Sequence, residues 1–365
     1  TYPQRDESLE NEVGEGIEVH RTDSFEPLQI YAKLVGKDRV PYGGFSNEKS
    51  NSKLSRFLRG NFFIPDARRG WNRFAYERAL KIIKDGSIDA VVTTGPPHST
   101  HLIGLKLKKN EGIKWLADLR DPWTDIYYNE QMIRTEWAKR QDERYEKAVL
   151  HAADLCITAS HGFAELFSEK VKREYHVITN GYDEGETDSV EGQKQNDRLV
   201  ISYTGTMAES YDPGAFFRAL KSLDNPFEVR IAGSVSDGIK RQVKESGLES
   251  SIAYLGYLPH DAALQEMKAA DLLLLITPKV DNAKGIIPGK LFEYLSTGNP
   301  ILAITENLNG DVAEILQETG AGRALSRDSV NEMIDFLQTK HSDYRTPKKY
   351  HRRELTRRFV EILES

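Results

Sequence analysis

Cysteine is almost absent from this chain of 365 residues, since Cys156 is the only one. A single cysteine excludes a disulfide within the chain, and its place in the apolar run Leu155-Cys156-Ile157 predicts a buried strand residue. A reducing, cytoplasmic setting is therefore expected. The chain also lacks an apolar run of about 20 residues, the length that crosses a bilayer. A basic excess is missing too, because the net charge is −6, which argues against general nucleic-acid binding.

Short motifs for metal or phosphate chemistry are also missing. The sequence contains no His-Glu-x-x-His, no Asp-x-Asp triplet and no Walker-type loop. We therefore expect neither a bound metal nor a cofactor.

What the sequence does contain is an alternation of apolar strands and amphipathic helices, spread over a length typical of two domains. In the first half, strands are expected at 16–20, 88–94, 113–119, 154–158 and 175–179, and helices at 26–35, 52–58, 71–84, 100–107, 129–152 and 162–169. The helix at 129–152 carries mixed charges, which we assign to its solvent side. This alternation predicts an α/β fold with parallel, doubly wound sheets.

The second half repeats the alternation after a polar, acidic linker at 184–197. Strands are expected at 199–203, 227–232, 252–255, 271–276, 301–304 and 322–325, with helices at 213–223, 237–246, 261–270, 311–318 and from 329 onward. A basic stretch at 348–353 leads into a last helix ending near 363. The chain opens on polar residues, so we expect the first strand and helix of the first domain to be missing from it.

The most informative stretch is 284–304, where a loop leads into a helix. Pro288 suits the first helical position, and the backbone N–H groups of the residues that follow lie at the positive end of the helix. At 100° per residue, Leu291, Phe292 and Leu295 share a core face. Gly289, Lys290 and Glu293 share the opposite face. N–H groups and an ammonium suit a diphosphate, and the carboxylate suits the hydroxyls of a ribose. The alternative is an amphipathic helix with a salt-bridging Glu.

Residues 289–301 resemble the GT-B glycosyltransferases, specifically the retaining family GT4, in which a helix with a ribose-binding Glu precedes Gly-x-Pro and a strand. Gly285 occupies the position of an earlier family Glu near the donor sugar. The resemblance implies two facing Rossmann-like domains. An N-terminal acceptor domain would span 1–180, a linker 181–197, a nucleotide-sugar domain 198–345, and a terminal helix at 346–365 would cross back to the first domain.

Ligands of such sheets bind beyond the carboxyl ends of the strands. In the second half, the resemblance implies nucleotide contacts at these ends from Gly205, Thr206, Gly233, Gly256 and Tyr257, beside Gly289, Lys290 and Glu293. An Arg and a Lys that the family often places after the first of these turns are absent from 207–212. Lys290 is therefore the main cation expected near the diphosphate.

In the first half, the strand at 88–94 ends in a Gly-Pro-Pro-His-Ser-Thr turn, where Ser99 and Thr100 could cap the next helix. We expect His98 to face the ligand, the alternative being an exposed loop histidine. The next strand ends in Arg120-Asp121-Pro122-Trp123, similar to a GT4 subgroup of cell-envelope and capsular polysaccharide assembly. Asp121 and Arg120 are candidates for contacting sugar hydroxyls. The alternative is an ion pair of Arg120 with Asp118 or Asp121 that only shapes the loop.

The stretch 57–71 is rich in aromatics and arginine and lacks a helical period. Arg68 and Arg69 are candidates for binding a glycan or lipid-diphosphate acceptor. The alternative is an aromatic-anchored connection. For the basic stretch at 348–353, a solvated helix face and a peripheral contact with the inner face of a membrane both stay open.

Together these features predict a retaining, metal-independent glycosyltransferase that uses a UDP-, GDP- or dTDP-sugar, with a role in surface polysaccharide synthesis. Two alternatives are kept. One is a non-hydrolysing nucleotide-sugar epimerase, and the other is a degenerate nucleotide-sugar binder without enzymatic activity.

Overall fold

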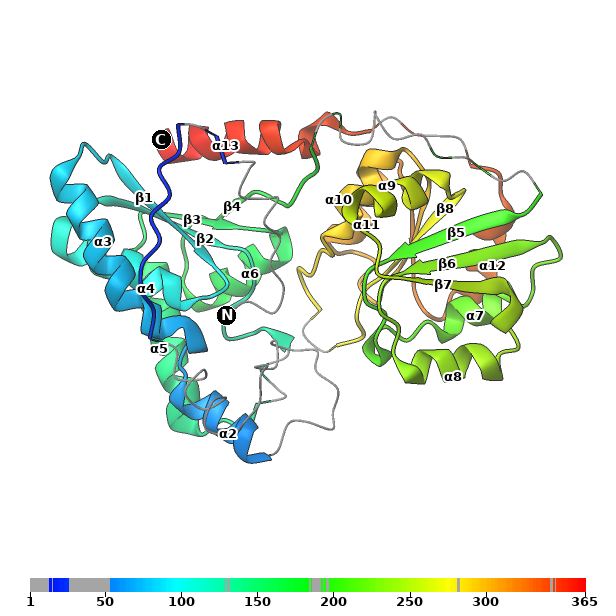
Figure 1. Ribbon diagram of the computed structural model, residues 1–365, viewed down its shortest axis with the longest axis horizontal. Helices are drawn as coiled ribbons and strands as arrows, with labels where there is room; N and C mark the ends of the chain where they lie inside the picture. Colours follow the sequence, from blue (N-terminus) through cyan, green and yellow to red (C-terminus); the bar gives the residue numbers. More distant parts are fainter. Residues whose placement is uncertain are drawn as a thin grey trace. The chain divides into compact units, whose positions relative to one another are not determined.

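The computed structural model describes residues 13–14, 16–25, 53–127, 129, 132–183, 185, 192, 194, 197–280, 283–341, 344 and 346–365. The described residues form two compact units. The first runs to Ile157 and includes Leu166–His176, and the second contains Thr158–Glu165 and Val177–Ser365. Both units appear in Figure 1.

The first unit contains a four-stranded sheet in the order β1-β2-β3-β4. Its strands are β1 (Ala90–Gly95), β2 (Lys114–Leu119), β3 (Leu155–Thr158) and β4 (His176–Val177). Its helices are α2 (Lys53–Phe62), the 3-10 helix η2 (Ala67–Trp71), α3 (Asn72–Asp85), α4 (Ser99–Glu111) and α5 (Glu136–Ala152), and α6 (His161–Lys170) is divided between the two units. β1 and β2 pair in parallel with Gly95 opposite Leu119, so their carboxyl ends lie next to each other.

The second unit contains a six-stranded sheet in the order β10-β9-β8-β5-β6-β7. The strands are β5 (Leu199–Thr204), β6 (Phe227–Ala232), β7 (Ile252–Gly256), β8 (Leu272–Ile276), β9 (Ile301–Ile304) and β10 (Gly322–Leu325), and all the pairs recorded between them are parallel. In chain order this is the Rossmann arrangement 3-2-1-4-5-6, whose direction of growth reverses between β5 and β8.

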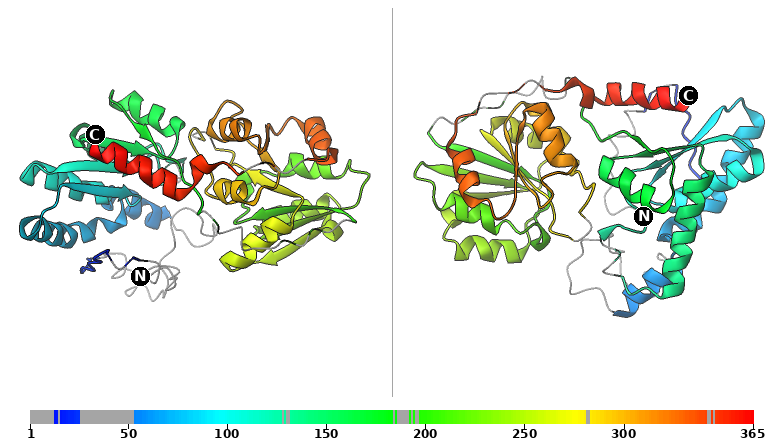
Figure 2. Two further views of the ribbon diagram at one scale, coloured as in Figure 1. Left: turned by 90° about the horizontal axis from the view of Figure 1, so that it is seen from above. Right: turned by 180° about the vertical axis from the view of Figure 1, so that it is seen from behind.

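Helices cover both faces of this second sheet (Figures 1 and 2). One face packs on α7 (Gly214–Leu220), α8 (Asp237–Glu245) and α12 (Val330–Gln338), through side chains such as Phe216, Val243 and Met333. The other face packs on α9 (His260–Ala269), α10 (Lys290–Thr297) and α11 (Asp311–Thr319), through Met267, Phe292 and Leu316. A helix α13 (Arg352–Glu364) ends the chain. Burial on both faces explains the almost continuous apolar runs of the central strands.

Several expected elements differ from the structure. Residues 16–20 form no strand, and α2 extends to Phe62, beyond the predicted end at 58. The predicted helix at 26–35 lies outside the described residues, as does most of the linker. α5 begins at Glu136 instead of 129, because the Thr135 hydroxyl accepts the Ala138 N–H and Asn61, from α2, accepts the Thr135 N–H at 2.7 Å.

Cys156 is fully buried in β3, as its apolar neighbours predict, and burial raises its pKa to about 11. None of the described helices combines the length and the apolar character that crossing a membrane requires.

Candidate functional site

The point where β5 and β8 separate is occupied by α10. The recorded pairs between these strands involve only Ile201–Leu272 and Ser202–Leu273. At Thr204, the last residue of β5, the backbone N–H donates to the Tyr294 hydroxyl at 2.9 Å. The Thr204 carbonyl accepts from the Lys290 Nζ at 2.8 Å. Two α10 side chains therefore satisfy the end of β5, and they fix the start of α10 at the switch point of the sheet.

The start of α10 presents unused backbone donors. Gly289 is the N-cap and is exposed, with nothing within 4 Å of where a Cβ would lie. Leu291 and Phe292 donate their N–H groups to Pro288 and Gly289, whereas the described residues provide no acceptor for the N–H groups of Gly289 and Lys290. The predicted core face is buried, but the helix begins two residues after Pro288.

Glu293 lies one turn into α10 and is partly exposed. Within the described part of the chain, its carboxylate has neither a hydrogen bond nor an ion pair. The salt-bridging role considered from the sequence is therefore not seen among these residues. A carboxylate left without partners beside two unused N–H groups can accept hydroxyl donors from a ligand.

Lys290 does not extend toward solvent as the helical projection suggests. Its Nζ lies 3.6 Å from the centre of the Tyr203 ring, in addition to its bond to Thr204. Burial lowers the pKa of Lys290 to about 7, and the nearby Glu293 carboxylate opposes part of that shift. The ammonium is thus poorly solvated without a ligand, and a diphosphate nearby would favour its charged form.

Two glycine turns meet at the carboxyl ends of β5 and β6. Gly205 has φ +101° and Gly233 has φ +138°, both in the range that only glycine adopts readily. A Cβ on Gly233 would lie 2.2 Å from the Gly205 carbonyl oxygen, and one on Gly205 would lie 3.6 Å from the Lys290 Nζ. These glycines therefore keep a narrow, backbone-lined surface next to Lys290.

The remaining donor candidates lie on the same edge of the sheet. Thr206 is exposed after β5. Gly256, at φ +69°, ends β7, and Tyr257 is 82% exposed beyond it. The structure thus brings the eight predicted nucleotide contacts to one edge of one unit, although their roles stay predictions.

The sequence analysis missed two residues at this edge. Tyr294 supports Thr204, as described above, and Arg327 is buried beside the turn after β5. Its guanidinium donates to the carbonyls of Tyr211 and Thr277 at 2.8 Å each and pairs with Glu306 at 2.6 Å. Arg327 therefore holds this turn rather than facing a ligand. Arg327 lies 116 residues after Tyr211 in the sequence, so no local pattern indicates that it contacts this turn.

In the first unit, His98 lies in the turn between β1 and α4, after two cis peptide bonds at Pro96 and Pro97. The ring is buried and stacks on Trp123, with centroids 4.9 Å apart. Both ring nitrogens lack a hydrogen-bond partner among the described residues. Burial lowers the pKa of His98 to about 3, so the ring is neutral. His98 is therefore not an exposed loop histidine.

The expected capping of α4 by Ser99 and Thr100 is wrong. His98 occupies the N-cap position and provides no side-chain cap. The carboxylate of Asp66, from the preceding segment, accepts the Ser99 N–H at 2.7 Å and the Ser99 hydroxyl at 2.8 Å. A carboxylate suits the positive end of the helix better than a hydroxyl does.

The polar residues after β2 lie next to this turn, because the Arg120 N–H donates to the Gly95 carbonyl at 3.0 Å. The Arg120 guanidinium lies 3.5 Å from the Asp118 carboxylate, which matches the pair considered from the sequence. Asp121 is partly buried, and burial raises its pKa although Arg120 opposes the shift. Asp118 is thus held by Arg120 and by the Thr94 hydroxyl, whereas no such contact is recorded for the Asp121 carboxylate among the described residues.

The acceptor candidates Arg68 and Arg69 lie within the 3-10 helix η2, which follows α2. Arg69 donates to the Ile64 carbonyl at 2.9 Å and lies 5.1 Å from the centre of the Tyr145 ring. Arg68 is partly buried, and its N–H donates to Asp66. Their acceptor role stays a prediction.

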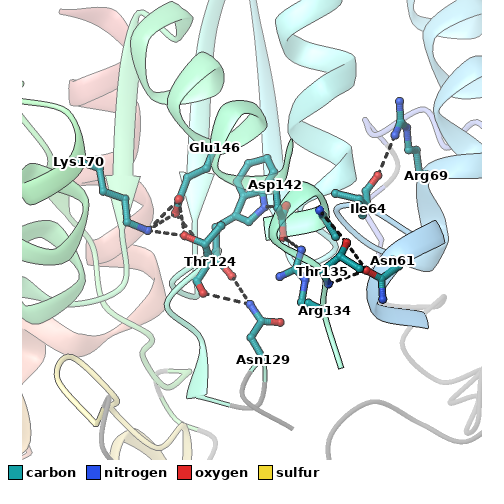
Figure 3. Close-up of polar contacts among 12 residues, drawn as sticks. Asn61, Ile64, Arg69, Thr124, Asn129, Arg134, Thr135, Asp142, Glu146 and Lys170 are labelled. Atoms are coloured by element: carbon teal, nitrogen blue, oxygen red, sulfur yellow. Dashed lines mark hydrogen bonds and ion pairs between the residues drawn. The ribbon is translucent and has the colours of Figure 1, made fainter. Parts of the chain in front are cut away.

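The acidic residues of α5 that pack inward hold the loop after β2 (Figure 3). Asp142 accepts from the Trp123 indole at 2.8 Å and from Arg134 at 2.6 Å. Glu146, fully buried, accepts from the Thr124 hydroxyl at 2.6 Å and pairs with Lys170 at 2.8 Å. The assignment of the α5 charges to solvent is therefore wrong for these two carboxylates. No group of three or more His, Cys, Asp or Glu side chains in the described ranges is arranged to hold a metal ion.

Comparison with known proteins bears on the fold. No family model matches the chain. Anabaena HepE in complex with UDP aligns with a TM-score of 0.60 and 15% identity, covering 79% of this chain and 81% of that one. The lipopolysaccharide outer core galactosyltransferase WaaB aligns with a TM-score of 0.56 and 16% identity, covering 81% and 80%. The chain has the GT-B fold. The expected fold class is thus confirmed, whereas membership of GT4 stays a prediction.

The GT-B chain also has a curated relative. It is 21% identical to the alpha-D-kanosaminyltransferase of Streptomyces kanamyceticus over an alignment of 213 residues. The alignment covers 56% of this chain and 53% of that protein. The chain spans about half the length of this relative.

Proposed function

We propose that this protein is a retaining, metal-independent glycosyltransferase that transfers a sugar from a nucleotide-diphosphate-sugar to a hydroxyl of a glycan or lipid-linked acceptor. A role in surface polysaccharide synthesis agrees with the Arg120–Trp123 resemblance. One observation carries the proposal. At the switch point of a Rossmann-ordered sheet, α10 presents a desolvated lysine together with two N–H groups and a carboxylate that have no partner among the described residues.

The diphosphate would accept hydrogen bonds from the N–H groups of Gly289 and Lys290. Helix N-termini favour such anions, and Lys290 adds a full charge where the leaving group becomes negative. Glu293 would accept both hydroxyls of the ribose. Thr206 and the glycine turns at Gly205 and Gly233 would border the phosphates, and Gly256 and Tyr257 would contact the base.

The names of the similar proteins support a nucleotide-sugar donor. HepE has been solved with UDP and with UDP-glucose, and WaaB is named a galactosyltransferase. For this chain, UDP is accordingly the first donor nucleotide to test, followed by GDP and dTDP.

Gly285 requires a different arrangement around the donor sugar. Its φ of +78° is unfavourable for a glutamate, so the backbone here suits the glycine that the sequence carries. In our proposal the sugar contacts of the missing carboxylate come from other residues. Asp121, Arg120 and His98, in the first unit, are the candidates for contacting sugar or acceptor hydroxyls.

A thermal-shift screen of UDP-, GDP- and dTDP-sugars tests the proposal. At least one donor should raise the thermal midpoint of the wild type. Glu293→Ala should lose most of that shift. Glu314→Ala is the matched control, because Glu314 occupies the same position in α11, four residues after a glycine N-cap, and is exposed. It should keep the full shift.

Turnover separates the alternatives. Release of nucleoside diphosphate that depends on a glycan or lipid-linked acceptor supports the transferase. Conversion of the sugar without any acceptor would instead indicate an epimerase. Donor binding without turnover over a broad acceptor panel would indicate a non-enzymatic binder.

A further inference from the structure

A pocket of about 180 Å³ lies within the first unit, between α2, the turn that precedes α4 and the loop before α5. Its lining includes Arg59, Asp66, His98, Arg134 and Asp142, with apolar walls from Phe63 and Met132 among others. Figure 3 shows two of these residues, Arg134 and Asp142, in the network behind the loop after β2. None of its lining residues belongs to α10 or to the residues predicted to bind nucleotide.

We propose that this pocket binds the acceptor through an oxyanion, a phosphate or a carboxylate that the acceptor sugar carries near the hydroxyl to be glycosylated. The inference rests on the proposed transferase function and adds the acceptor class to it. It moves the acceptor contacts from Arg68 and Arg69 to Arg59 and His98.

The first argument is the set of polar atoms left without partners. The buried His98 ring has no hydrogen bond at either nitrogen, and the buried Nε of Arg134 has none either. Arg59 is partly buried, its pKa is lowered by burial, and the described residues give it neither an ion pair nor a hydrogen bond. Buried polar groups of this kind are costly unless a ligand or water satisfies them.

The second argument is the charge balance. The two carboxylates of the lining are already used. Asp66 accepts from Ser99 and from the Arg68 N–H, and Asp142 accepts from Trp123 and Arg134. The unused donors therefore belong mainly to arginines, and Arg59 is the charged group of the lining that has no counterpart among the described residues. An oxyanion supplies that counterpart, because guanidinium binds phosphate and carboxylate in a forked geometry.

The third argument is the neutral state of His98. A neutral imidazole has one donor and one acceptor nitrogen, so it pairs with a hydroxyl better than with an anion alone. The pocket volume exceeds the roughly 150 Å³ of a protein cavity that holds benzene, so one six-membered sugar ring fits. An anionic sugar satisfies both Arg59 and His98.

Calorimetric titration of the full chain tests the inference, with glucose, glucuronate, glucose 6-phosphate and inorganic phosphate as probes. Each titration is run with and without saturating UDP. UDP in the first arm keeps the probe anions away from α10, and the second arm tests the pocket even if UDP does not bind. We expect glucuronate or glucose 6-phosphate to bind at least tenfold more tightly than glucose in the presence of UDP. Which of the two binds identifies the carboxylate or the phosphate.

Arg59→Met should abolish the preference for the anionic sugar without changing UDP affinity or the thermal midpoint. Arg140→Met is the matched control, because Arg140 is exposed on α5 and does not line the pocket. It should retain the preference. His98→Gln should weaken binding of the anionic sugar at least fivefold and leave inorganic phosphate unaffected.

Three results would overturn the inference. They are the absence of any preference for anionic sugars, a preference that survives in Arg59→Met, and inorganic phosphate binding as tightly as the sugar phosphate. Failure of UDP, GDP and dTDP alike to bind the wild type would instead contradict the nucleotide-sugar function.

Discussion

Lys290 shows how a single side chain serves both the fold and the candidate site. Its Nζ is held between the Thr204 carbonyl and the face of Tyr203, and burial lowers its pKa to about 7. The charge that a diphosphate needs is therefore only partly present near neutral pH. A bound diphosphate favours the ammonium form of Lys290. Where Lys290 is neutral in the free protein, it therefore takes up a proton when the diphosphate binds.

This proton uptake gives a pH dependence with a definite sign. Below about pH 7, Lys290 is already charged, so its contribution to UDP affinity should not change with pH. Above pH 7, affinity should fall by up to about tenfold per pH unit, because the ammonium must be re-formed on binding. The measurement is the ratio of UDP Kd values for wild type and Lys290→Met between pH 6 and 9. The ratio cancels the titration of UDP itself, and a ratio independent of pH would contradict this role.

At the scale of elements, the end of β5 is shaped by glycine turns and by α10. The two turns approach so closely that a side chain on Gly233 would overlap the Gly205 backbone, whereas Gly205 is restricted by its φ of +101°. Their hydrogen bonds join the two turns, since Gly205 donates to Ala232 at 2.7 Å and Met207 to Ser234 at 2.8 Å. The carboxyl edge of the sheet is thus rigid before any ligand arrives.

Gly233→Ala should therefore destabilise the protein by about 3 kcal/mol or more and abolish UDP binding, because its Cβ overlaps the Gly205 backbone. Gly247→Ala is the control. Gly247 also has a positive φ, +69°, but nothing lies within 4 Å of its Cβ position, so only about 1–2 kcal/mol should be lost. Thermal unfolding with and without UDP compares the two variants. Equal losses in both would contradict the close approach of the turns.

Elements whose bounds follow from their own hydrophobic pattern were predicted well. The strand at 301–304 has the predicted bounds, because its burial on two faces requires apolar residues. The start of α5 was not predicted, since Thr135 is fixed by Asn61, 74 residues earlier. The orientation of Lys290 depends on β5 in the same way. The pocket around Arg59 and His98 also combines distant segments, and no local pattern indicates it.

For the whole molecule, the alternation of strands and helices was enough to predict two α/β units, and the resemblance at 289–301 added the GT-B fold to that prediction. The sheet of the second unit confirms the Rossmann order that this fold requires. Function was predicted less completely, because fold alone does not determine chemistry. The proposed activity therefore depends on α10, and the proposed acceptor class depends on the first-unit pocket.

A crystal structure of the protein with UDP tests the central claim most directly. We predict diphosphate oxygens about 3 Å from the backbone nitrogens of Gly289 and Lys290, with the ribose hydroxyls on Glu293. UDP bound elsewhere, or with Glu293 turned away from the ribose, would contradict the account.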